Sequence, residues 1–423
     1  MADRGVHQTG GLIQIHDFAG HPFQAELSRE LARRELTVEH AYSAQYTSGK
    51  GRLERQPGDP DTLSFRAIET PRQFEKYAPI GRLQFERSFA STWIDQVTKL
   101  QPDLVIACNV PLFALYRFSR FARRTGLPYV LWHQDVFSLA LAEELERRLP
   151  HVPRLPHPVV GAGSRFFTRL ERGVVAGARR VVAIDDAFVR EYEAWGLDTT
   201  HVEVVPNWAP VDEIVPEERD NAWADTHLGR RDCLRLLYAG TLGRKHNPLL
   251  LVELLERLRE RGVDAELTVV SEGEGADLLA QAAAERPGIA DFVRLLPFQP
   301  ADQLSRVLGS GDVLVALLEP GASKFSIPSK VLSYLAAGRP VLGIMPADNP
   351  AAVDIESVGG CVVQPDHDAV ADAVAWLESL AANPAQRNEL GKRSRELAVR
   401  RFGIDTIAKR FMEIIGEATR RTT

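Results

Sequence analysis

The segment at residues 323–341 has residue types and spacing that could bind a phosphate group. It reads S-K-F-S-I-P-S-K-V-L-S-Y-L-A-A-G-R-P-V. Ser326 is a good N-cap residue, Pro328 is tolerated in a first helical turn, and Gly338 is the residue type that follows a helix end. The pattern therefore predicts a helix that starts at Ser326, ends before Gly338 and leads directly into a strand.

The start of this predicted helix would present unpaired backbone N–H groups at Ile327, Ser329 and Lys330. The helix dipole favours an anion at that point, and the side chain of Lys330 adds a full positive charge. We therefore expect a phosphate site there, with Lys330 as a candidate catalytic residue. An ordinary capped helix is the alternative.

A second cluster reads G-T-L-G-R-K-H-N at residues 240–247 and directly follows a predicted strand. Gly240 and Gly243 would let the backbone approach a ligand closely. Arg244 and Lys245 supply the cations that suit a diphosphate, and they are further candidate catalytic residues. A solvated basic turn is the alternative.

Two more loops of the second half follow predicted strands. One reads S-E-G-E-G and contains Gly273, and the other reads P-F-Q and contains Phe298 and Gln299. Ligands of open parallel α/β sheets bind at the carboxyl ends of the strands, so these residues are candidate ligand contacts. Turns that only connect a strand to a helix are the alternative.

The first half of the chain has its own candidates at strand ends. His133 and Asp135 end one predicted strand, and we expect both to project into a ligand cleft. Gly20 and His21 follow the first predicted strand, and Asn207 follows the last one of this half. A structural histidine and ordinary turns are the alternatives.

The composition is that of a globular protein with more than one domain. The chain has 423 residues, 44% of them hydrophobic, and a net charge of −6, which argues against a dedicated nucleic-acid binder. Cys108, Cys233 and Cys361 form neither a disulfide framework nor a zinc motif, and we expect no metal and no cofactor. The N-terminus lacks the apolar region of a signal peptide, and no apolar run is long enough to span a membrane, so we expect a cytoplasmic protein.

Short apolar, β-rich runs alternate with amphipathic stretches in two successive series, which is typical of parallel sheets covered by helices. A stretch rich in proline and charge separates the two series. The sequence therefore predicts two Rossmann-like doubly wound α/β domains that face a central cleft. The expected segments are an N-terminal acceptor domain at 1–208, a linker at 209–232, a C-terminal donor domain at 233–403 and a helix at 404–421 that packs back on the first domain.

The stretch at residues 154–180 is unusually basic. It holds six arginines and one acidic residue among apolar side chains such as Phe166 and Phe167. An amphipathic helix of this kind suits peripheral contact with an anionic membrane surface. A packed helix with a solvated basic face is the alternative.

The sequence P-S-K-x-x-x-Y-L-A-A-G-R-P-V at 328–341 resembles the donor-site helix of retaining glycosyltransferase family 4, which has the GT-B fold. It is similar in particular to the branch that builds bacterial surface polysaccharides. The resemblance covers nearly all of residues 234–415 and, more loosely, residues 12–208. It implies that a nucleoside-diphosphate sugar is the donor, that His133 contacts the donor sugar or the reacting centre, and that transfer retains the anomeric configuration without a metal.

The chain departs from the family pattern at several positions. The family's E-x7-E pair is absent, because Ser333 stands where the second Glu usually holds the ribose and Phe325 stands at the first. Ser333 could supply a hydroxyl instead, and Glu319 could supply a carboxylate from the preceding loop. Thr241 replaces the usual Arg, and the loop after the first strand has one glycine, Gly20, instead of two.

These observations predict a transferase that moves a sugar from a nucleoside diphosphate to a hydroxyl of a carbohydrate, glycolipid or small-molecule acceptor. Bacterial surface polysaccharide or glycoconjugate synthesis is the expected setting, at the inner face of the membrane if the basic stretch makes contact. A nucleotide-sugar epimerase of related fold is one alternative. A non-catalytic nucleotide-sugar-binding subunit is the other, and the missing E-x7-E pair favours it.

Overall fold

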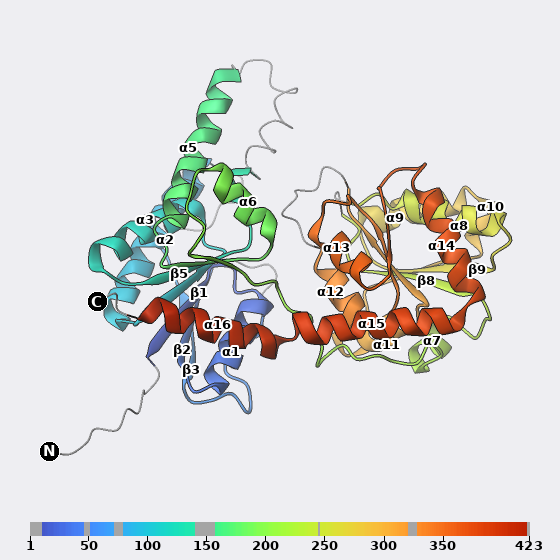
Figure 1. Cartoon of the computed structure of the whole chain (residues 1–423), viewed down its shortest axis with the longest axis horizontal. Coiled ribbons are helices and arrows are strands. Elements are labelled where there is room, and N and C mark those ends of the chain that lie inside the picture. Colours follow the sequence, from blue (N-terminus) through green and yellow to red (C-terminus); the bar gives the residue numbers. More distant parts are fainter. Residues whose placement is uncertain are drawn as a thin grey trace. The chain divides into compact units, whose positions relative to one another are not determined.

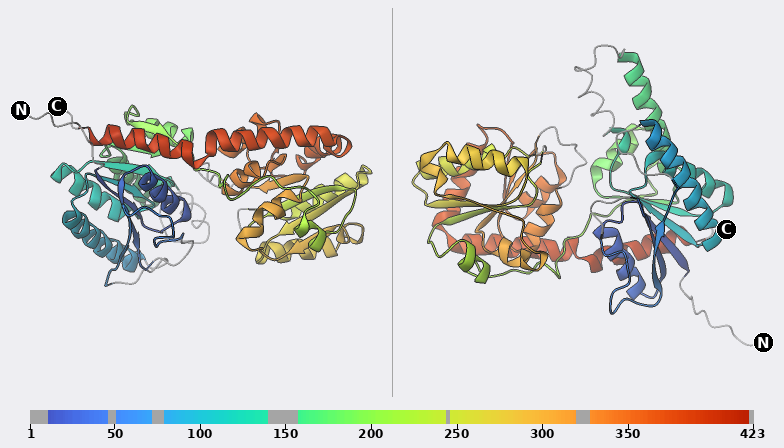
Figure 2. Two further views of the ribbon diagram at one scale, coloured as in Figure 1. Left: turned by 90° about the horizontal axis from the view of Figure 1, so that it is seen from below. Right: turned by 180° about the vertical axis from the view of Figure 1, so that it is seen from behind.

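The computed structural model describes residues 11–45, 51–71, 79–139, 157–243, 246–319 and 328–420. The chain divides into two compact units (Figure 1). The first unit comprises Met1–Asn207 and Ile407–Thr423, and the second comprises Trp208–Thr406. Each unit is a parallel sheet with helices on both faces (Figure 2), so the predicted pair of α/β folds is confirmed.

The first unit contains a seven-stranded sheet in the order β3-β2-β1-β4-β5-β6-β7, with every neighbouring pair parallel. This order continues the doubly wound pattern by one strand. The strands are β1 (Leu12–Asp17), β2 (Thr37–Ser43), β3 (Leu63–Ile68), β4 (Leu104–Cys108), β5 (Tyr129–His133), β6 (Arg180–Ala183) and β7 (Val202–Val204). The helices are α1 (Pro22–Arg33), α2 (Pro79–Leu100), α3 (Leu112–Thr125), α5 (His157–Val175) and α6 (Asp186–Ala194), with α16 (Ile404–Thr419) entering from the second unit.

Burial explains why the central strands form. Both β4 and β5 are buried at every position, because helices cover the two faces of the sheet. The last helix adds to this packing, since the ring of Phe411 in α16 lies edge-on to Trp132 of β5 with the ring centroids 4.9 Å apart. Arg180 of β6 also pairs with Glu417 of α16 at 2.9 Å.

The second unit contains a six-stranded parallel sheet in the order β10-β9-β8-β11-β12-β13. Its strands are β8 (Leu234–Ala239), β9 (Ala265–Val270), β10 (Val293–Leu296), β11 (Val313–Leu317), β12 (Val341–Ile344) and β13 (Cys361–Val363). Its helices are α7 (Ala222–His227), α8 (Leu249–Glu260), α9 (Glu274–Ala284), α10 (Pro287–Ala290), η2 (Ala301–Gln303), α11 (Leu304–Gly309), α12 (Ser329–Ala336), α13 (Pro350–Ser357), α14 (Val370–Ala382) and α15 (Pro384–Phe402).

Two apolar clusters cover the faces of this sheet. On one face, Leu335 of α12 packs in the same cluster as Leu314 of β11. On the other face, Leu255 of α8 and Leu377 of α14 pack with Val315 of β11. Successive residues of β11 therefore point to opposite faces, and both faces are buried, as a parallel sheet requires.

Two expected features differ in the structure. Residues 209–232, expected as a linker, belong to the second unit and include α7, whose first turn is capped by the side chain of Asn221. The helix expected to start at Ser326 starts at Ser329 instead, with Pro328 at its N-cap position, and Ser326 lies outside the described residues. The predicted end is confirmed, since Gly338 follows the helix in the left-handed conformation at φ 67°.

Candidate functional site

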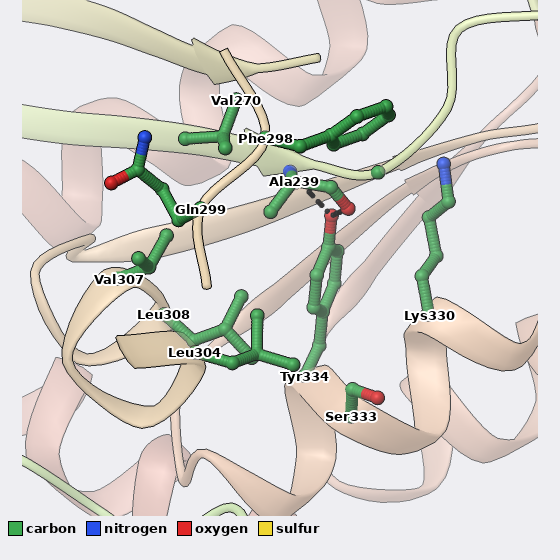
Figure 3. A pocket seen from close by; sticks show the side chains of 11 residues that line it. Ala239, Val270, Phe298, Gln299, Leu304, Val307, Leu308, Lys330, Ser333 and Tyr334 are labelled. Carbon is green, nitrogen blue, oxygen red and sulfur yellow. Dashed lines mark hydrogen bonds between the residues drawn. The ribbon is translucent and has the colours of Figure 1, made fainter. Parts of the chain in front are cut away.

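A pocket of about 190 Å³ lies at the carboxyl ends of β8 and β9 in the second unit (Figure 3). The loop after β10 and the helices α11 and α12 complete its walls, which is where a doubly wound sheet binds its ligand. The lining residues are Ala239, Gly240, Val270, Phe298, Gln299, Leu304, Val307, Leu308, Lys330, Ser333 and Tyr334.

The pocket has an apolar end and a cationic end. In Figure 3, Gln299, Val307 and Leu308 stand on one side of Tyr334, and Lys330 stands on the other. Ser333 lies next to Tyr334 on α12 and is half-buried. A ligand with an apolar ring at one end and a negative charge at the other would match this arrangement.

Lys330 is positioned by the first turn of α12 and by a tyrosine of the central strand. Its ammonium group donates a hydrogen bond to the hydroxyl of Tyr238 and lies 4.0 Å from the centroid of the tyrosine ring. Burial lowers the pKa of Lys330 to about 7, because the charged form loses hydration in this setting. The amine is therefore partly neutral near pH 7, and a bound anion would favour its protonated form.

Gly240 lies beside Lys330, at the end of β8. Its φ of 133° is one that residues with a side chain rarely adopt. A Cβ atom here would lie 3.5 Å from Cε and Nζ of Lys330, in the space beside the ammonium group. The N–H of Gly240 donates to the carbonyl of Val270 at 3.0 Å, which continues the β8–β9 pairing up to the rim of the pocket.

Tyr334 ties α12 to the end of β8. Its hydroxyl donates to the carbonyl of Ala239 at 3.0 Å and accepts the N–H of the same residue at 3.0 Å. Burial raises the pKa of Tyr334, which keeps the hydroxyl protonated. The sequence gives no separate sign of this residue's role, because a tyrosine on the buried face of an amphipathic helix looks like any core residue.

The loop after β8 rests on the start of α9. The N–H of Leu242 donates to Ser271 Oγ at 3.2 Å, and a Cβ on Gly275 would approach the carbonyl oxygen of Leu242 to 2.3 Å. Gly275 is therefore needed for this close contact. Gly273 is the N-cap of α9 with φ 94° and is exposed.

Several predicted donor-site residues lie near the pocket without lining it. The carbonyl of Thr241 accepts the Tyr238 hydroxyl at 2.9 Å, and the N–H of Gly243 donates to His246 Nδ1 at 3.0 Å. Ser329 is the exposed first residue of α12. Within the described part of the chain, Glu319 Oε1 is buried and has no hydrogen-bond partner.

Three of the predicted residues lie outside the described residues: Arg244, Lys245 and Ile327. The part they play in the site therefore stays a prediction. Among the residues that are described, Gly240, Phe298, Gln299, Lys330 and Ser333 are brought together in one pocket.

The loop after β10 is held from outside by two side chains. The N–H of Phe298 donates to Glu272 Oε1 at 2.9 Å, and the indole N–H of Trp223 donates to Gln299 Oε1 at 2.9 Å. The amide Nε2 of Gln299 donates to the carbonyl of Pro297 at 2.9 Å. The ring of Phe298 is 47% exposed and is free to cover a ligand.

The first unit gathers polar groups at the carboxyl end of β1. Asp17 accepts hydrogen bonds from the N–H of His21 and from Asn109 Nδ2, the second at 2.9 Å. Burial opposes ionisation of Asp17, but the side chains of His21 and Asn109 lower its pKa, and the carboxylate of Asp17 in turn raises the pKa of the His21 ring. Gly20 turns the chain before His21 at φ 70°.

His133 does not project into a ligand cleft as expected. It is 3% exposed, and its ring nitrogens meet Tyr192 Oη at 2.5 Å and Glu171 Oε1 at 3.1 Å. Glu171 also accepts the N–H groups of Phe137 and Ser138 at 2.8 and 2.9 Å. Both nitrogens of His133 are therefore engaged by protein groups, and Glu171 holds the segment after β5.

The other two candidates of the first unit have separate surroundings. Asp135 is exposed, and its charge helps to raise the pKa of His21. Asn207 exchanges two amide hydrogen bonds with Gln134, at 3.0 and 2.9 Å, which links the segments after β5 and β7.

The described residues hold neither a metal-binding cluster nor a membrane-spanning helix. They contain no group of three or more His, Cys, Asp or Glu residues arranged to hold a metal ion. Among the helices within the described ranges, none is both long enough and apolar enough to cross a bilayer.

Two family models match the chain in succession. Residues 20–208 match a glycosyl transferase 4-like domain, and residues 233–379 match the glycosyl transferases group 1. The second match includes every residue that lines the pocket.

Two proteins named as glycosyltransferases are similar to this one over much of the chain. WcaI of Escherichia coli (strain K12), named as a colanic acid biosynthesis glycosyl transferase, is 22% identical over 323 residues, which is 74% of each chain. A D-inositol 3-phosphate glycosyltransferase of Segniliparus rotundus is 27% identical over 275 residues, which is 64% of this chain and 56% of the relative.

Solved structures share the two-unit fold at low identity. Sucrose-phosphate synthase from Thermosynechococcus elongatus has a TM-score of 0.69 at 15% identity, over 96% of this chain and 98% of the other. HepE of Anabaena, solved in complex with UDP-glucose, has a TM-score of 0.65 at 15% identity, over 96% and 99%.

Proposed function

We propose that this chain, a glycosyltransferase of the GT-B fold, transfers a sugar from a nucleoside diphosphate to an acceptor hydroxyl during synthesis of a bacterial surface polysaccharide or related glycoconjugate. The named role of the relative WcaI in colanic acid biosynthesis supports this setting. HepE, which shares the fold, was solved with UDP-glucose, and this supports a nucleotide sugar as donor.

The observation that carries the proposal is the polarity of the pocket. The base and ribose of a nucleotide suit the apolar end beside Phe298, with Ser333 within reach of the ribose hydroxyls. The diphosphate suits the other end, where Gly240 leaves room and Lys330 supplies a charge. One ligand class, a nucleoside diphosphate, uses both ends.

The chemistry follows from that placement. The bond between the anomeric carbon and the diphosphate oxygen breaks, and negative charge develops on the leaving diphosphate. A protonated Lys330 in a partly dry site would stabilise that charge. In the retaining route that the resemblance implies, the acceptor oxygen bonds to the same face of the sugar, and the acceptor proton passes to the leaving phosphate.

We assign the acceptor side to the first unit. The candidates are Gly20, His21, Asp135 and Asn207 at the carboxyl ends of its strands. His21 is half-buried beside Asp17, and its raised pKa makes it a proton-bearing group that could hydrogen-bond an acceptor hydroxyl. His133 is assigned a supporting role, because its nitrogens are engaged by Tyr192 and Glu171.

We also propose that the basic stretch makes peripheral membrane contact. Helices α3 and α5 pack together. They carry exposed arginines, among them Arg120, Arg165 and Arg169. Phe166, which follows Arg165 in α5, is 51% exposed. The one acidic residue in the two helical sequences, Glu171, is buried. Such a surface suits anionic lipid. Co-sedimentation with phosphatidylglycerol vesicles, lost on R165E/R169E and absent with phosphatidylcholine, tests it.

A thermal-shift panel with UDP, GDP, dTDP and ADP, each with and without EDTA, tests the donor proposal. A ligand at about 100 times its dissociation constant adds roughly 2.7 kcal/mol of stability. A shift with one diphosphate that EDTA leaves unchanged supports a metal-independent nucleotide-sugar site. No shift at millimolar concentration favours the non-catalytic subunit, and a new sugar epimer formed from donor alone favours the epimerase.

A further inference from the structure

The apolar end of the pocket is built against a helix from the stretch expected as a linker. Trp223 of α7 is 4% exposed, and its ring stacks on His227 at a centroid distance of 4.7 Å. Asn221 caps α7 through the N–H groups of Trp223 and Ala224, and its own amide donates to the carbonyl of Arg306 in α11 at 2.9 Å. The indole of Trp223 is therefore held on a fixed support next to the pocket.

The two partners of the Gln299 amide fix which way it points. The indole N–H of Trp223 can only donate, so it must meet Oε1, at 2.9 Å. The carbonyl of Pro297 can only accept, so it must meet Nε2, also at 2.9 Å. A flipped amide would place two donors together and two acceptors together, and the observed orientation is therefore the one that satisfies both partners.

This orientation has a consequence for recognition. Because Trp223 already donates to Oε1, the amide is a weaker acceptor, and the same bond polarises its Nε2–H into a better donor. Gln299 lines the pocket at the end that suits a nucleobase. A base with a keto oxygen can accept from Nε2, whereas a base with an exocyclic amino group would meet another donor.

We propose that Trp223 is a positioning residue for nucleobase selection, which fixes the Gln299 amide so that the pocket favours a keto base over the matching amino base. This inference rests on the proposed function, since it assumes that the pocket holds a nucleoside diphosphate. It adds a specificity element that lies outside the pocket wall, in α7.

The experiment measures dissociation constants for two keto–amino pairs, UDP against CDP and inosine diphosphate against ADP. Within each pair an amino group replaces the exocyclic oxygen, and the adjacent ring nitrogen changes from a hydrogen-bond donor to an acceptor. The wild-type protein should favour the keto member of each pair by about tenfold, the scale of leaving one buried hydrogen-bonding group unsatisfied. In Trp223→Phe, which keeps the ring stacking but removes the N–H, the ratio should fall to within about threefold. Pyrophosphate affinity should not change, because it reports the cationic end alone.

Two further variants still test the proposal if Trp223→Phe folds poorly. Gln299→Glu replaces the donor by a carboxylate, which accepts from cytosine N4 and should turn the preference toward CDP. Trp376→Phe makes the same substitution in α14, away from the pocket, and should leave the ratio as in the wild type.

The outcomes separate this inference from the proposed function. If the wild type binds UDP and CDP equally, or if Trp223→Phe keeps the wild-type ratio, Trp223 has no part in base selection while the donor site stands. If the wild type binds none of these four diphosphates and neither GDP nor dTDP, the donor proposal itself is wrong. A parallel loss of pyrophosphate binding in Trp223→Phe would mean that Trp223 acts by general support of the fold.

Discussion

The carboxyl edges of the two sheets use their polar residues in different ways. In the seven-stranded sheet, Asp17 is bonded to His21 and Asn109, and His133 is bonded to Tyr192 and Glu171. In the six-stranded sheet, Lys330 lies at the corresponding edge, and among the described residues its hydrogen-bond partner is Tyr238. At the carboxyl edge of the seven-stranded sheet, which we call the closed edge, these polar groups are satisfied by protein partners. At the carboxyl edge of the six-stranded sheet, which we call the open edge, Lys330 can exchange its contact with Tyr238 for a ligand.

The difference teaches that a polar residue after a parallel strand is only a candidate for function. His133 and Lys330 both stand where ligands of such sheets bind. What separates them is the number of described protein groups that already satisfy them, two for the ring of His133 and one for the ammonium group of Lys330. Burial with complete hydrogen bonding indicates a structural role.

The largest expected effect comes from removing a buried hydrogen-bond acceptor at the closed edge. Glu171→Ala should lower the unfolding free energy of the first unit by about 3–5 kcal/mol, because it leaves His133 and the N–H groups of Phe137 and Ser138 buried without an acceptor. Urea unfolding followed by tryptophan emission measures the loss. UDP affinity of the folded variant should stay within about twofold of wild type, since the pocket belongs to the second unit. A joint loss of stability and affinity would contradict the independence of the two edges.

The next effect concerns the open edge. Lys330→Ala should reduce turnover by about 10²–10³-fold, which is the scale of losing one preorganised charge-stabilising group. Stability should change little, because the hydrogen bond of Lys330 is to a tyrosine that also bonds Thr241. Initial rates with saturating acceptor measure the effect, and Lys392→Ala, an exposed lysine of α15, is the control. Turnover of Lys330→Ala within about threefold of wild type would remove Lys330 from the mechanism.

The fold was predictable where strands are continuous apolar runs. The apolar, β-rich runs at 104–108, 234–239, 265–270, 313–317 and 361–363 form β4, β8, β9, β11 and β13. Strands β2 and β3 are not such runs, because β2 has polar residues at buried positions and β3 has exposed polar residues between its two buried ends. In β2, Glu39 is buried against Gln14 and Arg66, and His40 is buried against Ser28, and such pairings cannot be read from one segment alone.

The site was predictable where local geometry decides it. Gly240, Gln299 and Lys330 follow strand ends or start a helix, and the topology alone brings them together. Trp223 was not predictable, because it lies in a charged stretch without periodicity, where the Asn221 cap is the one sign of a short helix. Its contact with Gln299 spans 76 residues and depends on tertiary packing.

A smaller effect links pH to the open edge. Burial lowers the pKa of Lys330 to about 7, so above that pH the free protein holds a growing fraction of neutral amine. Diphosphate binding needs the charged form, and UDP affinity should therefore fall about fivefold from pH 7 to pH 8. Lys330→Arg, which stays charged, is the control and should show a flat profile over this range. Equal profiles for the two proteins would mean that Lys330 does not titrate at the site.

The smallest effect tests the closed edge from the acid side. His16 and His40 are fully buried, and burial lowers the pKa of His16 to about 3 and that of His40 to about 4. Both stay neutral in the folded protein but would charge near pH 6.5 in the unfolded chain, so stability is complete above that pH and falls as the pH drops. His16→Phe should preserve the stacking on Trp93, now at a ring distance of 4.1 Å, and should remove about 1 kcal/mol of the loss between pH 7 and pH 5.5. Urea unfolding midpoints at the two pH values measure this loss of stability. His201 is partly exposed, and the His201→Gln variant is the control. If His16→Phe and the wild type lose stability in parallel, acid does not act through the ring of His16, and the pH dependence comes from His40 or from carboxylates instead.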